Sequence, residues 1–155
     1  MKLRLVLMLM GVSLGAQAIE TGQTLEPFTL QDQFEETVTL TESTRILLVA
    51  SSRKAASVVD EAIKDQPEGY LDARQALYVA DISKIPGLVT RMFLIPSMRE
   101  ANYRVLLDRE SAVAPEHLKN DGEVLWLRLD NREVLERRTF TDAEELRAAL
   151  EEESS

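Results

Sequence analysis

The sequence predicts an α/β protein with a three-layer fold, in which a central mixed β-sheet is flanked by helices and preceded by a short β-hairpin. Three observations lead to this fold class. Residues 46–49 are an unbroken apolar run, typical of a strand that is covered on both faces. A helix of about a dozen residues and another apolar strand follow, as in a right-handed βαβ unit. Two strands joined by a tight turn and then a capped helix end the chain.

The first 18 residues have the pattern of a secretory signal peptide. Lys2 and Arg4 form a positive start, residues 5–14 an apolar core, and Ala18 ends an A-x-A cleavage site. The core is too short to span a bilayer, and no cysteine follows it, which excludes lipoprotein processing. We expect cleavage after Ala18, no stable membrane anchor afterwards, and one periplasmic or secreted domain over residues 19–155. An uncleaved anchor is the alternative.

Charge and composition exclude several classes of function. The chain has 18 basic and 27 acidic residues, a formal net charge of −9. Such a surface repels nucleic acids and anionic membranes, so we expect neither as a partner. The chain has no cysteine, so an exported form has no disulfide and no thiol redox site. We also expect no metal and no cofactor, because His117 is the only histidine and no dinucleotide fingerprint follows a strand.

The N-terminal hairpin is predicted over residues 22–40, where apolar and polar side chains alternate. Its core-facing positions are expected to be Phe28, Leu30, Val38 and Leu40, with Asp32 and Gln33 between the two runs. A polar connection then leads into the central strand, residues 45–50.

The central strand is followed by a turn and an amphipathic helix. Ser51 or Ser52 offers an N-cap hydroxyl to this helix, which we expect from Arg53 to about residue 65. Arg53 and Lys54 lie in its first turn, where the helix dipole favours acids over bases. An exception of this kind sometimes marks a site, although two solvated side chains also explain it.

A second strand is predicted over residues 75–81 and a second helix over residues 85–100, with Ser83 as a cap and Pro86 in the first turn. Pro96 should kink or end this helix. Its apolar surface is broader than an amphipathic stripe, so we expect the helix to be buried. The alternative is an exposed partner-binding patch made by Met92, Phe93 and Met98.

The remaining chain is predicted to complete the sheet and add one helix. Residues 103–107 form a strand that ends at Asp108, and residues 109–118 a short helical or irregular segment. Residues 122–129 form a strong strand, Asp130-Asn131 a hairpin turn, and residues 132–139 a charged edge strand. A capping box from Thr141 opens the last helix, whose buried stripe is Leu146, Ala149 and Leu150.

The order of these elements resembles the thioredoxin-like superfamily, in the branch shared by peroxiredoxins and secreted thiol reductases. Four segments carry the resemblance: the G-x-x-x-x-x-F-x-L-x-D entry from Gly22, the LLVASS strand, YRVLLDRESAVAPEHL, and GEVLWLRLDNREV with its capped helix. The resemblance implies the fold but not the activity. The reactive turn of the family falls at about residues 52–56, where no cysteine stands, and its cis-proline falls near residues 120–123, where no proline stands. No catalytic residue is therefore predicted, and we do not expect an enzyme of this family's chemistry.

Three functions remain open. The first is a binding or adaptor domain of the bacterial envelope without redox chemistry, whose partner is another envelope protein or a peptide. The second is a small-anion site for a carboxylate or phosphate at the helix start. The third is a carboxylate enzyme in which Asp81 and Asp108 act as acid and base. The candidate ligand residues lie at the carboxyl edge of the sheet, where open α/β sheets bind ligands: Ser51, Ser52, Arg53, Lys54 and Asp81.

Overall fold

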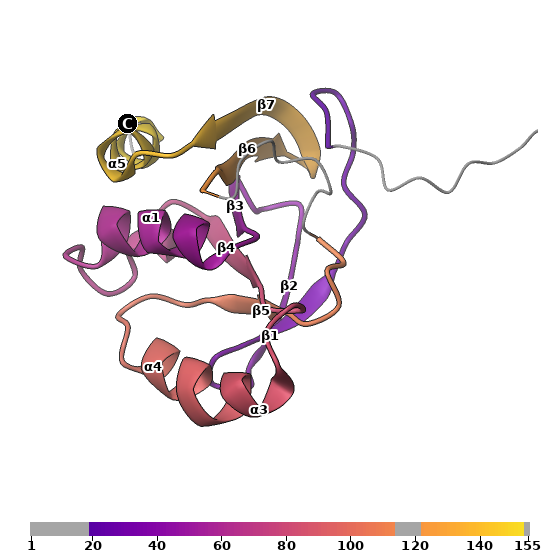
Figure 1. Cartoon of the computed structure of the whole chain (residues 1–155). Coiled ribbons are helices and arrows are strands. Elements are labelled where there is room, and N and C mark those ends of the chain that lie inside the picture. The colour runs from indigo at the N-terminus through magenta and orange to yellow at the C-terminus, as the bar shows by residue number, and fades with distance from the viewer. Residues whose placement is uncertain (1–18, 114–121, 154–155) are drawn as a thin grey trace, which may run out of the picture.

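Seven strands form one mixed sheet in the computed structural model, which describes residues 19–113 and 122–153. The order across the sheet is β2-β1-β5-β4-β3-β6-β7 (Figure 1). The strands are β1 (Thr29–Asp32), β2 (Thr37–Thr39), β3 (Ile46–Ala50), β4 (Ala76–Asp81), β5 (Leu106–Asp108), β6 (Val124–Asp130) and β7 (Glu133–Phe140). The helices are α1 (Arg53–Ile63), α2 (Tyr70–Ala73), α3 (Gly87–Val89), the π-helical η1 (Thr90–Leu94), α4 (Ile95–Arg99) and α5 (Ala143–Glu152).

The sheet is mixed because only its centre is parallel. Strand β3 pairs in parallel with β4, and β4 pairs in parallel with β5. The hairpin β1–β2 joins the outer side of β5, and the hairpin β6–β7 joins β3, all in antiparallel pairing. The fold class predicted from the sequence is confirmed, and so are the N-terminal hairpin and the charged strand at the sheet edge.

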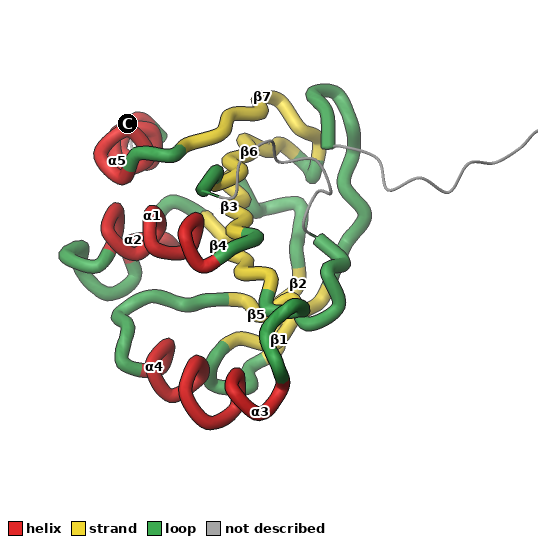
Figure 2. The backbone as a smooth tube through the Cα atoms, viewed as in Figure 1, coloured by secondary structure: helices red, strands yellow, loops and turns green. Residues whose placement is uncertain are grey.

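Strand β3 is buried over its whole length, as its apolar run predicts. Its alternate side chains enter two separate core clusters, one on each face of the sheet. Helices α1 and α5 cover the face that carries Trp126, and the two helices lie on the same side of the sheet (Figure 2). The cluster on the other face includes Leu25 and Leu40 from the N-terminal segment. The central strand is therefore covered on both sides.

Local capping and turn chemistry differ from the sequence expectation at three places. The N-cap of α5 is Asp142, whose carboxylate accepts from the amides of Glu144 and Glu145, and not Thr141. Pro86, and not Ser83, is at the N-cap of α3. The β6–β7 turn is Asn131-Arg132, one residue later than expected. Both of its residues have positive φ, 48° and 67°, as the twist of a two-residue hairpin requires.

The helical segment α3–η1–α4 continues past Pro96, although the sequence predicts a kink or an end there. Proline lacks the N–H of an α-helical hydrogen bond, and its ring would meet the carbonyl one turn earlier. The preceding turn widens into η1, in which the Ile95 amide donates to the Thr90 carbonyl. This wider turn lets the helix continue to Arg99.

Parts of the sequence interpretation lie outside the described residues. These are the predicted signal peptide (residues 1–18), His117, and most of the irregular segment expected after Asp108. Within residues 19–113 and 122–153, no helix has both the length and the apolar character needed to cross a membrane.

The stability of the fold falls at high pH, because burial raises the pKa of three tyrosines, Tyr70, Tyr78 and Tyr103. Tyr103 Oη donates a 2.6 Å hydrogen bond to Asp60 Oδ1, which joins α1 to the segment before β5. Burial raises the pKa of Tyr78 above its usual 10.0, and the charge of Asp60 adds to this effect. Burial also raises the pKa of Tyr103, followed by its hydrogen bond to Asp60. The unfolded chain therefore releases these protons first, so stability is fully present below about pH 10 and falls as the pH rises further.

We expect Tyr103→Phe to lower the free energy of unfolding by about 1 kcal/mol near neutral pH, because Asp60 loses a half-buried hydrogen-bond donor. The alkaline loss of stability should also become shallower. Urea unfolding followed by the fluorescence of Trp126, the only tryptophan, measures both effects. Tyr70→Phe is the matched control for the effect near neutral pH, since Tyr70 Oη is buried, no described residue hydrogen-bonds to it, and its removal should cost nothing there. Equal losses in the two variants would contradict the role of the Asp60 contact.

Candidate functional site

The three parallel strands end at one edge of the sheet, where the sequence places the candidate site. Strand β3 leads into Ser51 and Ser52, and the last residues of β4 and β5, Asp81 and Asp108, are direct partners in the parallel register. Asp81 and Asp108 are thus neighbours, as the carboxylate-enzyme hypothesis requires.

Both aspartates are occupied in holding the loops that follow their strands. Asp108 is fully buried, and its carboxylate accepts from the amides of Glu110, Ala112 and Val113 at 3.3, 3.0 and 2.9 Å. Asp81 accepts from the Ser83 amide at 2.9 Å and from Ser111 Oγ at 2.7 Å. All four carboxylate oxygens accept hydrogen bonds, so this geometry favours a capping role over acid–base catalysis.

The start of α1 is closed by its own residues. Ser52 is the N-cap, and its hydroxyl accepts from the Ala55 amide at 3.0 Å. An anion at the helix start would compete with this hydroxyl for the same amide. Ser51 Oγ is buried, and no described residue hydrogen-bonds to it.

Arg53 and Lys54 are both exposed, and no described residue forms an ion pair with either. The methylene groups of Lys54 lie over Gly122, where an added Cβ would come within 3.1–3.4 Å of them. Lys54 therefore covers the start of the chain leading to β6, with its stem packed and its charge in solvent.

An apolar stripe on α3 and η1 is the most unusual surface of the described chain. Leu88, Val89, Met92 and Phe93 are 60, 40, 56 and 67% exposed. These four, named here the α3–η1 stripe, are four of the six large apolar side chains exposed among the described residues. The expectation that this helix is buried is therefore wrong. Isolated exposed apolar residues are ordinary, whereas a contiguous group is a feature of interaction sites.

Met98 does not share the exposure of the stripe. Its side chain is half-buried and packs against the core cluster to which α1 contributes. The alternative in which Met92, Phe93 and Met98 form one exposed patch is thus corrected to Leu88, Val89, Met92 and Phe93.

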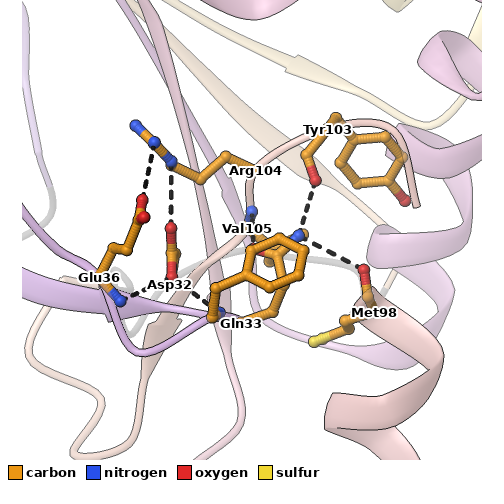
Figure 3. A network of polar contacts seen from close by, with 8 residues as sticks. Asp32, Gln33, Glu36, Met98, Tyr103, Arg104 and Val105 are labelled. Carbon is orange, nitrogen blue, oxygen red and sulfur yellow. Dashed lines mark hydrogen bonds and ion pairs between the residues drawn. The ribbon is translucent and has the colours of Figure 1, made fainter. Parts of the chain in front are cut away.

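A buried glutamine fixes the end of α4 against the N-terminal hairpin. Gln33 is fully buried, and its amide nitrogen donates to the carbonyls of Tyr103 and Met98 at 2.8 and 3.3 Å. Its amide oxygen accepts from the Val105 amide at 2.9 Å. Figure 3 shows Gln33 between these three partners. The sequence pattern indicates only that Gln33 lies between the two hairpin runs, since nothing in it distinguishes Gln33 from a solvated turn residue.

An ion pair lies beside Gln33. Asp32 is buried, its Oδ1 accepts from the amides of Phe34 and Glu36, and its Oδ2 lies 3.2 Å from Arg104 Nε (Figure 3). Arg104 also contacts Glu36 at 3.3 Å. These contacts close the hairpin turn and leave Arg104 without free charge for a ligand.

Two hollows of the described surface lie at the opposite end of the sheet. One, of about 280 Å³, is lined by the hairpin turn, α2 and the segment before β5, including Asp32, Tyr70 and Arg104. The other, of about 450 Å³, is lined in part by Arg45 and Gln75, which precede β3 and β4. Neither coincides with the carboxyl edge. No group of three or more histidine or acidic side chains within residues 19–113 and 122–153 is placed to hold a metal ion.

Comparison with known proteins identifies the fold. No family model and no curated protein matches the chain. Among solved structures, the peroxidoxin BcpB of Mycobacterium tuberculosis aligns over 88% of this chain and 96% of its own, with a TM-score of 0.57 and 18% identity. The chain has the thioredoxin-like fold. The thioredoxin domain of a thiol-disulfide oxidoreductase from Bacteroides vulgatus (TM-score 0.57, 9% identity) is covered over 100% of its length and 89% of this chain.

A third thioredoxin-like structure, a thio-disulfide isomerase from Thermus thermophilus, has a TM-score of 0.53 and 15% identity over 88% of this chain and 99% of its own. These names describe redox proteins, whereas the present chain has no cysteine. The chain thus has the same fold without a cysteine, and the start of α1 carries Ser52, Arg53 and Lys54. Thiol chemistry is absent because its reacting atom is absent.

Proposed function

We propose that this protein is a protein- or peptide-binding module of the bacterial cell envelope, exported by its predicted leader and acting without thiol chemistry. The α3–η1 stripe is the observation that carries this proposal. Burying one large apolar side chain contributes about 1.5–3 kcal/mol, so four adjacent side chains provide the core of a small interface.

The position of the stripe supports a binding role rather than a defect of packing. Half-buried Leu94, Ile95 and Met98 pack this helical segment against the core, and Gln33 donates a hydrogen bond to its Met98 carbonyl. The opposite side of the same helix presents its apolar side chains to solvent. A rigid surface of this kind loses little conformational entropy when a partner binds.

A photo-reactive benzoylphenylalanine in place of Phe93, in cells that produce the protein, tests the proposal. We expect a discrete crosslinked adduct in the envelope fraction, because the probe replaces the most exposed ring of the stripe. The matched control is the same probe at Leu135, which is 40% exposed on the edge strand β7. The proposal fails when position 93 yields no adduct, or when both positions yield the same one.

A further inference from the structure

We propose that the α3–η1 stripe binds an acidic peptide segment that carries large apolar side chains. This inference rests on the proposed binding function and adds the chemistry of the partner. The large apolar side chains of such a peptide would contact Leu88, Val89, Met92 and Phe93, which are exposed. Its acidic side chains would contact the basic residues beside them.

The segment that carries the stripe has a charge opposite to that of the chain. Residues 82–99 contain Lys84, Arg91 and Arg99 and no acidic residue, although the chain has 27 acids against 18 bases. Arg99 is committed to the fold, because its Nε donates to the Gln33 carbonyl at 2.7 Å. Lys84 and Arg91, named here the cationic rim, are exposed, and no described residue forms an ion pair with either.

Three arginines elsewhere in the described chain pair with carboxylates. Arg104 pairs with Asp32 and Glu36, Arg128 with Glu136 and Glu153, and Arg138 with Glu152. Arg53 and Lys54 also form no ion pair with a described residue, so what distinguishes the cationic rim is its place beside an exposed apolar stripe. It lies next to the stripe along the chain, with Lys84 four residues before Leu88 and Arg91 directly before Met92. A partner with carboxylates around an apolar centre would satisfy both features at once.

Two other occupants fit this surface less well. In a symmetric dimer each cationic rim would face the same patch of the other copy, so like charges would come together. An anionic bilayer presents its charge to a large part of a molecule with a net charge of −9. A short peptide meets only the charges within about 10 Å of it, and the segment of residues 82–99 that carries the stripe has bases and no acid.

Selection from a display library of random peptides of about 12 residues, roughly three helical turns, tests the inference. The purified protein is compared with three variants. Lys84→Glu/Arg91→Glu reverses the rim, Leu88→Ser/Phe93→Ser removes the stripe, and Lys64→Glu reverses an exposed charge on the far end of α1 as the matched control.

We expect the unchanged protein and Lys64→Glu to select peptides that combine Asp or Glu with Leu, Phe or Trp. The rim-reversed variant should select basic peptides with the same apolar residues, and the stripe variant should select neither. A selected acidic peptide should bind the rim-reversed variant at least about tenfold more weakly and should weaken with added salt.

Selected peptides without an acidic bias, or acidic peptides that bind the rim-reversed variant equally well, overturn the inference. The proposed binding function then still stands if the stripe variant selects nothing. A dimer of the unchanged protein that Leu88→Ser/Phe93→Ser dissociates, or sedimentation with anionic phosphatidylglycerol vesicles that the same variant abolishes, overturns the peptide partner in favour of that occupant. If none of the four forms of the protein selects a peptide, the inference is overturned. The photo-probe at Phe93 then decides the proposed function independently.

Discussion

Gln33→Leu is expected to lower the free energy of unfolding by about 3–5 kcal/mol, among the largest effects of any single substitution in this chain. Leucine fills a similar volume but cannot bond. The Val105 amide and the Tyr103 carbonyl would lose their bond to this fully buried side chain, while the Met98 carbonyl would keep only the Ala101 amide. Each unsatisfied buried group costs about 1–3 kcal/mol. Urea unfolding followed by Trp126 fluorescence measures the loss.

Gln31→Leu is the matched control, because it makes the same chemical change two residues earlier on an exposed position of β1. We expect it to change the free energy of unfolding by less than about 0.5 kcal/mol. Gln33→Leu should also loosen α4, since the hydrogen bond to the Met98 carbonyl is lost. Hydrogen exchange of the α3–η1–α4 amides should rise in Gln33→Leu and not in Gln31→Leu. Equal stability of the two variants would show that Gln33 is not what holds this helix.

Much of the sheet could be predicted from the sequence, because the pattern of apolar and polar residues that marks a strand is local and periodic. The run before Ser51 has no polar position and so requires cover on both faces, and the structure divides its side chains between two clusters. In β6 the alternation of Val124 and Trp126 with the intervening leucines sets which side chain enters which cluster. The sequence predicts the turn between β6 and β7 one residue too early. Asn131 tolerates positive φ by itself, whereas Arg132 adopts it only because the twist of the hairpin requires it.

The exposed stripe and the buried glutamine could not be predicted, because tertiary position decides both. Broad apolar character around a helix fits a buried helix as well as an exposed one. The α3–η1–α4 segment lies along the margin of the sheet beside β1 and β5, where no other described helix covers its outer side (Figure 1). A polar residue in a hairpin turn is expected in solvent, and Gln33 is buried only because the chain returns beside it some 70 residues later. An exposed surface of this kind is found by exposure and charge, not by motif.

Asp108→Ala is expected to lower the free energy of unfolding by about 3–5 kcal/mol, through a different mechanism at the opposite edge of the sheet. The carboxylate at the end of β5 is fully buried and accepts from three backbone amides, those of Glu110, Ala112 and Val113. Alanine removes the acceptor of all three amides. Asp108→Asn should cost less stability than Asp108→Ala, because the remaining amide oxygen of asparagine still accepts hydrogen bonds. Some loss is expected, because the new NH₂ group is a donor that faces a backbone N–H, which is also a donor.

Asp65→Asn is the control for Asp108→Asn, because Asp65 is exposed beyond the end of α1 and should tolerate the change. The pair also separates a structural aspartate from a catalytic one. If Asp108 holds the loop that follows β5, then Asp108→Ala should raise hydrogen exchange at residues 110–113. Asp108→Ala should also lose more stability than Asp108→Asn. Two stable variants with an unaltered loop would remove the capping explanation and restore Asp81 and Asp108 as a pair of carboxylates available for chemistry.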